Sequence, residues 1–317
     1  VGSEMCIRDR IYRQREVGER IMSITFKQVE HIYSENTPFS YHALRGVNLD
    51  IKKGSMTALI GHTGSGKSTL VQHINALLLP TAGEINIDDI LITATNKPNT
   101  LKPLRKKAGL VFQFPEYQLF EETILKDIIF GPKNFGVEEE DAIIQAKEML
   151  KLVGLDESYL ERSPFDLSGG QKRRVAIAGI LAMNPDILIL DEPTAGLDPQ
   201  GAKEMLQLFK KINQQGKTVL LVSHDMNQVL EYCDDVIVMN KGQVERHVSV
   251  DELFKETEYL TSLSIDLPII TSFILKLNEG GFHLDPSMKN IEELIEAIGG
   301  QILSLIHISE PTRLGMI

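Results

Sequence analysis

The chain has 317 residues, a length that predicts about two domains or one large α/β domain with an appendage. Hydrophobic residues make up 42% and aromatic residues only 6%, which favours an aliphatic α/β interior. The net charge of −11 argues against a nucleic-acid partner and against direct binding to anionic lipid. No stretch reaches the roughly 18 uninterrupted apolar residues that a membrane span needs. We therefore expect any membrane role to pass through a protein partner. The two cysteines have no metal-ligand or disulfide spacing, which fits a reducing cytosol.

The two ends of the chain differ in character from the rest. Residues 1–21 show no apolar period and no signal-peptide core, whereas Met22 begins a clear strand pattern. Residues 1–10 and 304–317 resemble translated sequencing-adapter read-through. We therefore predict that 1–21 and 304–317 are non-native extensions and that Met22 is the natural start.

Alternating apolar and polar residues at 23–33, 47–51 and 84–88 predict a small antiparallel sheet with one covered face. Tyr33 ends the first of these strands, where its ring could stack on an adenine. An ordinary exposed tyrosine at a strand end is an equally good interpretation, and Tyr41 is a second candidate for the stacking role.

A glycine-rich stretch follows the apolar run 56–60 and precedes an amphipathic run at 69–79, so it indicates a strand, a phosphate loop and a helix. Backbone N–H groups of such a loop and the positive end of the helix suit a polyphosphate. Lys67 would bridge the β- and γ-phosphates, and the Ser68 hydroxyl would bind the accompanying Mg²⁺. The predicted nucleotide-binding residues of this stretch are Gly61, His62, Thr63, Gly64, Ser65, Gly66, Lys67, Ser68 and Thr69.

Residues 108–112 predict a short buried strand that ends at Gln113. This end is the usual ligand side of an open parallel sheet, where an amide can bind Mg²⁺ and sense an attacking water. Helical spacing at 123–130, 138–153 and 157–161, without a convincing strand, predicts a helical insert over about 114–165.

A second anion site is predicted at the start of the helix over 172–183. It comprises Ser168, Gly169, Gly170 and Gln171, a serine with two glycines at a helix start. One triphosphate at Lys67 does not need two such helix ends, so we expect this one to serve a nucleotide on another subunit. The alternative is an ordinary helix cap.

The apolar run 187–190 predicts a parallel strand that is buried on both faces and ends in two carboxylates. Asp191 would hold Mg²⁺ through its water shell, and Glu192 would orient or deprotonate the attacking water. A solvated strand end is the alternative. Asp198 follows in a tight loop before a helix that starts at Pro199, and it could reach across a dimer seam.

The strand predicted at 218–223 ends at His224, which we expect to touch the γ-phosphate. Residues 235–239 and 242–247 predict a closing hairpin. Beyond it, helical stretches are predicted at 251–256, 268–277 and 290–298, with no visible chemistry.

These motifs, in this order and spacing, resemble the full set of an ATP-binding-cassette ATPase over residues 22–247. The segment 112–123, together with 61–63 and 130–132, is similar to the energy-coupling-factor transporter ATPases and most similar to their second ATPase subunit. The resemblance implies an α/β P-loop NTPase core with an antiparallel β subdomain, a helical subdomain and a C-terminal helical extension. It also implies that residues 251–301 form a dimerisation region.

The same resemblance implies an ATP hydrolase that uses ATP and Mg²⁺ and powers the uptake of vitamins or metal ions. Its partners would be a homologous ATPase or a second copy, a transmembrane scaffold and a substrate-capture component. It would lie as a peripheral protein on the cytoplasmic face of the cell membrane. A DNA-repair or translation cassette would need long coiled coils or two cassettes, and a non-hydrolysing regulator should lack Glu192.

An acidic cluster directly after Gln113 comprises Glu116, Glu121 and Glu122. In the family that the chain resembles, a groove beside this glutamine receives arginine-bearing helices of the scaffold. We therefore expect these carboxylates to pair with the scaffold, although a solvated helix face is the alternative.

Overall fold

A computed structural model describes residues 22–95 and 100–309 of the chain, with side chains up to residue 303. The predicted extension at 1–21 and residues 310–317 of the predicted tail lie outside the described residues. Residues 304–309 continue the last helix, α12 (Ile291–Ser309), which begins close to the predicted helix start at 290 but runs well past its predicted end at 298.

The first sheet is antiparallel and confirms the predicted alternating strands. Its order is β2 (Tyr41–Lys52), β1 (Met22–Tyr33), β4 (Ala82–Ile87) and β5 (Ile90–Thr93). The strand β2 starts six residues earlier than the predicted 47–51, because pairing with β1 continues as far as Tyr33 and Tyr41. Ladder hydrogen bonds thus extend the strand beyond its alternating stretch.

The second sheet carries the strands with unbroken apolar runs. Its order is β10 (Gln243–Ser249), β9 (Asp235–Asn240), β3 (Met56–Ile60), β8 (Thr218–Val222), β7 (Ile187–Asp191) and β6 (Ala108–Val111). All neighbouring strands are parallel except the hairpin pair β9 and β10. The carboxyl ends of β3, β6, β7 and β8 therefore meet at one edge, as expected for a ligand-binding α/β sheet.

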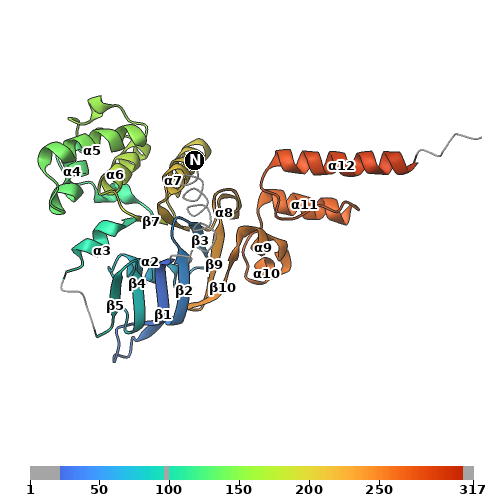
Figure 1. The fold of residues 1–317 in the computed structure, drawn as a ribbon, viewed down its shortest axis with the longest axis horizontal. Coiled ribbons are helices and arrows are strands. Elements are labelled where there is room, and N and C mark those ends of the chain that lie inside the picture. The colour runs from blue at the N-terminus through green and yellow to red at the C-terminus, as the bar shows by residue number, and fades with distance from the viewer. Residues whose placement is uncertain (1–21, 96–99, 310–317) are drawn as a thin grey trace, which may run out of the picture.

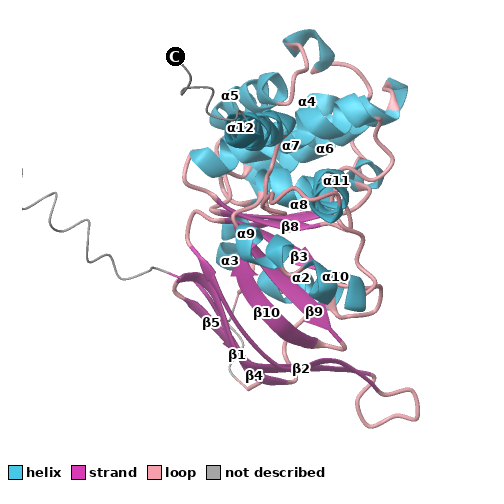
Figure 2. Cartoon of the chain, turned by 90° about the vertical axis from the view of Figure 1, so that its right-hand side faces the viewer, coloured by secondary structure: helices cyan, strands magenta, loops and turns pink. Residues whose placement is uncertain are grey.

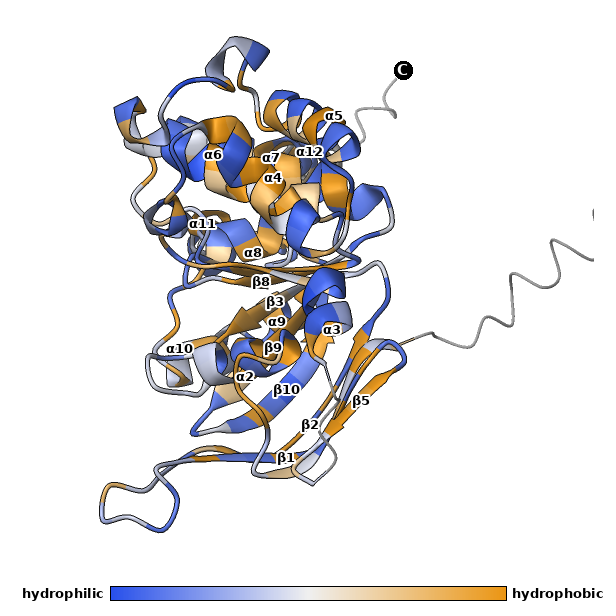
Figure 3. Ribbon diagram, turned by 90° about the vertical axis from the view of Figure 1, so that its left-hand side faces the viewer, coloured by the Kyte–Doolittle hydropathy of each residue, from blue (hydrophilic) through white to orange (hydrophobic). Residues whose placement is uncertain are grey.

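Two layers of apolar side chains cover the two faces of this second sheet. One layer joins it to the antiparallel sheet and to α2 (Lys67–Ile74). The other joins it to α7 (Pro199–Gln214), α8 (Met226–Tyr232) and the helical insert. Figure 2 shows this stacking, and Figure 3 shows the hydrophobic strands between the layers. Alternate residues of a buried strand point to opposite layers, which explains the continuous apolar runs.

The remaining helices form an insert and a C-terminal extension. The described residues 114–164 hold helices and 3₁₀ turns and no strand, the structure expected of the predicted helical insert. The insert contains α4 (Ile124–Asn134), α5 (Glu139–Leu152) and the 3₁₀ turns η1 (Pro115–Gln118) and η2 (Glu157–Tyr159), and α3 (Lys102–Lys107) precedes it. The turn η3 (Pro164–Asp166) leads from it to α6 (Gly169–Ala182), which packs against α4 and α5. The extension contains α9 (Val250–Lys255), α10 (Thr257–Ser262), α11 (Ile269–Glu279) and α12.

The last two helices lie side by side and project from the rest of the chain (Figure 1). They have a small core of their own, made by Ile274, Leu284 and Leu294. This separate core is consistent with a distinct C-terminal region after the hairpin.

The helix after the phosphate loop is shorter than the amphipathic run 69–79 predicts. It ends at Ile74, and the Asn75 side chain then accepts a hydrogen bond from the Leu77 amide at 3.2 Å. The same amide also donates to the Gln72 carbonyl at 2.9 Å, a backbone bond typical of helix ends. Ala76 then takes a left-handed conformation, with φ of 54°.

His73 provides a test of this packing. It is fully buried in α2, and Nδ1 lies 2.6 Å from the Thr69 carbonyl oxygen. Burial lowers the pKa of His73 to about 4. In the unfolded chain a histidine titrates near 6.5, so between these values the unfolded state binds more protons, and stability falls as the pH falls. The contribution between pH 7 and pH 5 is about 2 kcal/mol.

We expect the His73→Leu variant to lose this component, so that its free energy of unfolding depends less steeply on pH over that range. Chemical denaturation at pH 7 and pH 5 measures it. His283→Leu, at an exposed position, is the control. An unchanged pH slope in His73→Leu would show that the buried ring is not the source.

Candidate functional site

The phosphate loop is held in an open conformation by its glycines and by the β9–β10 turn. Gly61 and Gly66 have φ of 143° and 106°, which side chains rarely adopt, and a Cβ on Gly61 would lie 2.2 Å from the Met239 carbonyl oxygen. The Gly242 amide of the turn donates to the Ser65 carbonyl at 2.9 Å. The hairpin therefore braces the loop from behind.

Polar groups of the loop are disposed toward an anion. Lys67 Nζ donates to the Gly61 and His62 carbonyls, at 2.6 and 3.1 Å, so the ammonium folds over the loop. The Ser65 hydroxyl is buried and has no hydrogen-bond partner among the described residues. Not every loop residue faces the anion, because the His62 ring lies 2.8 Å from the Thr63 carbonyl and 3.0 Å from Asn240 Oδ1. Both contacts brace the loop.

Glu192 sits at the centre of the strand-end cluster. Its amide donates to the Val222 carbonyl at 3.1 Å, and its φ is 48°. A left-handed conformation at a residue other than glycine costs free energy and concentrates at functional sites. Gln113 Nε2 donates to Glu192 Oε2 at 3.2 Å, and His224 Nδ1 lies 3.1 Å from Oε1. The structure thus brings the three predicted catalytic residues, from three strand ends, into direct contact.

The charges at this edge favour a cation and a polyphosphate. Burial raises the pKa of Asp191, and the Glu192 charge raises it further, whereas Lys67 partly offsets both. Burial lowers the pKa of Lys67, and Glu192 and Asp191 offset part of that shift. Two carboxylates thus share one half-buried ammonium. A cation bound beside Asp191 and Glu192 would stabilise the two carboxylates. The positive charge of that cation and of Lys67 would in turn attract an anion.

The predicted metal ligands Ser68, Gln113 and Asp191 supply oxygen donors, which are the donors that Mg²⁺ prefers. No group of three or more His, Cys, Asp or Glu side chains in the described part of the chain could hold a metal ion. The donor set therefore fits a Mg²⁺ that takes most of its ligands from water and a nucleotide, as Mg²⁺ usually does.

Both tyrosines proposed for the adenine lie near the phosphate loop. The Tyr33 hydroxyl is 3.2 Å from Thr69 Oγ1, and its ring packs edge-on against His31 at 4.5 Å. The Tyr41 hydroxyl donates to the Gly64 carbonyl at 3.5 Å. The structure therefore leaves two aromatic platforms beside the loop, of which Tyr33 is the more firmly fixed.

The second predicted anion site lies elsewhere in the chain. Ser168 caps α6, and its backbone amide donates to Gln171 Oε1 at 3.0 Å in a capping box. The ordinary helix cap given as the alternative is thus present, and the role toward a partner's nucleotide stays a prediction. Helix α6 belongs to the helical layer, on the face of the second sheet opposite α2 (Figures 1 and 3). Gly169 and Gly170 leave open space above the first turn. Asp198 caps α7 by accepting from the Gly201 amide at 3.0 Å.

The acidic cluster is not uniformly available to a partner. Glu116 pairs inside the chain with Arg173, by hydrogen bonds of 2.9 and 3.1 Å, and only 15% of its side chain is exposed. Glu122 lies 2.8 Å from Lys126 at the surface. The expectation that Glu116 faces the scaffold is therefore wrong, because a buried cation already neutralises it.

Arg173 is a site residue that the sequence analysis missed. It follows Gln171 by two residues and contacts the segments after Gln113 and after Glu192. The sequence shows a run of three basic residues, Lys172, Arg173 and Arg174, and no pattern in it singles out Arg173. The pairing of Arg173 with Glu116 could not be predicted, because the two residues are 57 positions apart in the sequence.

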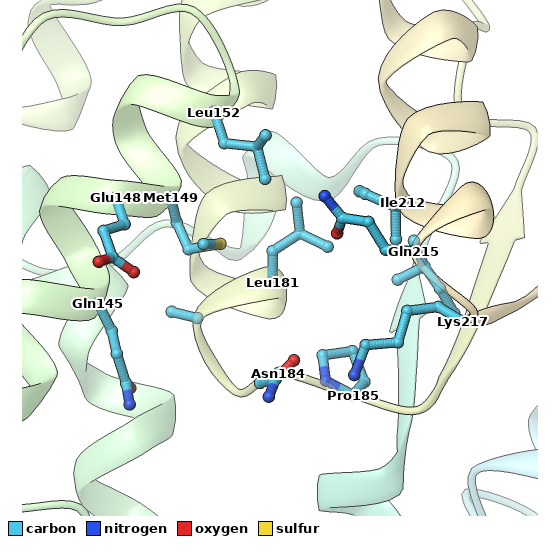
Figure 4. A pocket seen from close by; sticks show the side chains of 12 residues that line it. Gln145, Glu148, Met149, Leu152, Leu181, Asn184, Pro185, Ile212, Gln215 and Lys217 are labelled. Carbon is cyan, nitrogen blue, oxygen red and sulfur yellow. The ribbon is translucent and has the colours of Figure 1, made fainter. Parts of the chain in front are cut away.

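A hollow of about 310 Å³ lies away from this edge, between α5, the α6–β7 segment and the end of α7 (Figure 4). Met149, Leu181 and Ile212 contribute its apolar wall, and Gln215 and Lys217 lie at its side. None of its lining residues is a predicted site residue. The hollow is therefore separate from the strand edge at which the predicted site residues gather.

A phosphate loop, two carboxylates, a glutamine and a histidine gathered at strand ends define a nucleotide-hydrolysing P-loop protein. Comparisons with known proteins agree. Residues 44–195 match the ABC transporter family model. The chain is 52% identical over 278 residues to the energy-coupling factor transporter ATP-binding protein EcfA2 of Enterococcus faecalis, covering 87% of this chain and 96% of that protein.

Another relative is the EcfA2 protein of Lactiplantibacillus plantarum, 54% identical over 282 residues, with 89% of this chain and 96% of that protein covered. Among solved structures, cbiO1 of Clostridium perfringens, part of the ABC transporter complex cbiONQ, has a TM-score of 0.67 and 38% identity, covering 80% of this chain and 98% of that one. The ATP-binding cassette MJ0796 bound to ADP and Pi has a TM-score of 0.64 and 36% identity, covering 71% and 98%. The chain therefore belongs to the energy-coupling factor transporter ATP-binding proteins of the ABC ATPase family.

Lys67 and Glu192 should have separable roles. Lys67→Ala removes the ammonium over the loop and should weaken ATP binding itself. Glu192→Gln keeps the shape of the side chain but removes the proton acceptor. It should therefore leave ATP affinity nearly unchanged and lower turnover by about 10² or more. Equilibrium binding of a fluorescent ATP analogue and steady-state phosphate release measure the two effects. Wild-type turnover in Glu192→Gln would exclude this carboxylate as the base.

Proposed function

We propose that this chain is one of two ATPase subunits that hydrolyse Mg²⁺-ATP at a shared interface and so power uptake of a vitamin or a metal ion through a membrane scaffold. The observation that carries the proposal is the Glu192 carboxylate, held between Gln113 and His224 beside Lys67. A non-hydrolysing regulator has no use for a proton acceptor in a strained conformation at this position.

The proposed reaction is the attack of water on the γ-phosphorus of ATP. Glu192 accepts a proton from the water, Gln113 and His224 fix the carboxylate, and Lys67 balances charge on the phosphates. Mg²⁺ held by Ser68, Gln113 and Asp191 would neutralise charge on the phosphate oxygens. The His224 side chain is 77% exposed, whereas that of Glu192 is 24% exposed. The histidine thus faces outward, where a γ-phosphate would lie.

The proposed pairing rests on the separation of the two anion-binding helix ends. The starts of α2 and α6 lie in layers on opposite faces of one sheet, so one triphosphate would not engage both. In a head-to-tail pair, Ser168 and Gly170 of each subunit would contact the nucleotide at the partner's loop. Asp198, at the start of α7, would lie at the seam between the subunits. Residues 251–301 are the proposed dimerisation region.

The proposed membrane partner follows from family membership and from the surface beside Gln113. Among the described residues, no helix has the length and apolar character to cross a bilayer. Exposed aromatic rings of Tyr117, Phe120 and Phe130 lie on the insert close to Glu121 and Glu122. An apolar surface with adjacent carboxylates suits a scaffold helix that carries arginine. The proposed location is the cytoplasmic face of the cell membrane, with the substrate-capture component bound to the scaffold.

Ser168→Arg tests the shared site. A bulky cation would fill the space proposed for the partner's γ-phosphate, so the assembled ATPase pair should lose at least about 10² in turnover. ATP affinity at the chain's own loop should change little, because Lys67 and its neighbours are untouched. Phosphate release by the pair and ATP binding to the isolated chain measure the two quantities.

Ser168→Ala is the matched control, because it removes the cap, at a cost of about 1 kcal/mol in stability, without adding bulk. It should lose less turnover than Ser168→Arg, because it removes one hydroxyl contact to the partner's nucleotide without blocking closure. A severe loss of ATP affinity in isolated Ser168→Arg would show instead that this helix end acts within its own chain, and the paired site would then be abandoned.

A further inference from the structure

Arg173 is a buried cation whose side chain joins three separate segments. It lies on α6 and is 3% exposed. Its guanidinium makes a forked pair with Glu116, with Nε to Oε2 at 3.1 Å and Nη2 to Oε1 at 2.9 Å. Nη1 donates to the Pro193 and Ala195 carbonyls, at 3.3 and 2.6 Å. The planar fork thus uses all three nitrogens, as a buried arginine requires.

The segments that Arg173 joins are those that follow the catalytic side chains. Glu116 is three residues after Gln113, and the guanidinium carbon lies 5.7 Å from the centre of the Phe114 ring. Pro193 is the residue after Glu192. Gln113 and Glu192 also contact each other at 3.2 Å. One guanidinium therefore fixes the chain immediately beyond both members of the Gln113–Glu192 pair.

The third segment is α6 itself, since Arg173 follows Gln171 at the start of this helix by two residues. A displacement of α6 would carry the guanidinium with it and pull on both anchored segments. We propose that Arg173 is a positioning residue, which sets Gln113 and Glu192 relative to each other and makes their alignment depend on where α6 lies. The inference rests on the proposed role of Glu192 as the base.

Lysine cannot replace this arginine. The lysine ammonium lacks the planar set of donors of a guanidinium. It would therefore bind either the Glu116 carboxylate or the carbonyls after Glu192, but not both at once. The segment after Gln113 and the segment after Glu192 would then move independently. A misplacement of about 1 Å at a catalytic group can cost about 10² in rate. The nucleotide loop makes none of these contacts, so nucleotide binding should be spared.

The test compares Arg173→Lys and Glu116→Gln with Arg174→Gln in the assembled ATPase pair. Arg174 is the matched control, because it is the next residue of the same helix and also binds one carboxylate and one carbonyl. Its partners are Glu204 at 2.8 Å and the Val153 carbonyl at 2.7 Å, and neither belongs to the segments after Gln113 or Glu192. The readouts are kcat and KM for ATP, binding of a fluorescent ATP analogue, and the melting temperature.

Arg173→Lys should lower kcat by about 10², with analogue affinity within about threefold of wild type and KM little changed. Glu116→Gln keeps the shape but weakens the pair, so it should lower kcat by about tenfold, and it gives an answer if Arg173→Lys does not fold. Arg174→Gln should stay within about twofold of wild type. Loss of folded protein would lower apparent kcat without changing KM, but it would lower the amount of bound analogue by the same factor. Full binding stoichiometry beside a reduced kcat therefore excludes it.

If wild type hydrolyses ATP but Arg173→Lys or a folded Glu116→Gln matches Arg174→Gln, the positioning role is wrong and the proposed function stands. If the wild-type pair hydrolyses no ATP, the proposed function falls, and the role of Arg173 falls with it.

Discussion

The site depends on the hydrogen bond from the Glu192 amide to the Val222 carbonyl, just past the end of the β7–β8 ladder. At this bond Glu192 takes a left-handed conformation, with φ of 48°, and its carboxylate contacts Gln113 and His224. Neighbouring parallel strands deliver the other groups to the same edge, so the position of this carboxylate follows from the register of the sheet. A one-residue slip of β7 would move Asp191 and Glu192 out of reach together and turn their apolar neighbours to the wrong layer.

Electrostatics at this edge explain why the chain is poised for a ligand. Lys67 is half-buried beside two carboxylates, and its ammonium is held by loop carbonyls that lie where the phosphates of a nucleotide are expected. A polyphosphate with its cation supplies opposite charge to both the lysine and the carboxylates. On the side of His224 this edge of the sheet is open to solvent, and the His224 side chain is exposed. The capped start of α6 has the opposite character, a set of backbone donors, which is what the proposed head-to-tail pairing requires of the partner's surface.

Features of the fold and the site that arise from contiguous residues were predictable from the sequence, whereas contacts between distant residues were not. The phosphate loop and the buried strands were predicted correctly, because glycine spacing and continuous apolar runs are properties of contiguous residues. The helix after the loop was overestimated, since the chain turns at Ala76 in a left-handed conformation, where the Leu77 amide donates to the Gln72 carbonyl and to the Asn75 side chain. Glu116 was assigned to a partner, because its charge is visible in the sequence whereas Arg173, 57 residues later, is not visibly its neighbour. Pairings across the fold of this kind need coordinates. The ligand contacts of Tyr33, Ser168 and Asp198 stay predictions, since each side chain has an internal partner that also accounts for its position.

The central claim is that one chain carries half of each catalytic unit. The most direct measurement is the specific ATPase activity of an equimolar mixture of this chain and a homologous ATPase subunit, recorded over a wide range of protein concentration without the scaffold. If nucleotide is enclosed between two chains, activity per chain rises with concentration and reaches a plateau when the pair is formed. Activity per chain that stays constant down to concentrations at which light scattering detects only monomers would contradict the account, because a single chain would then contain the complete site.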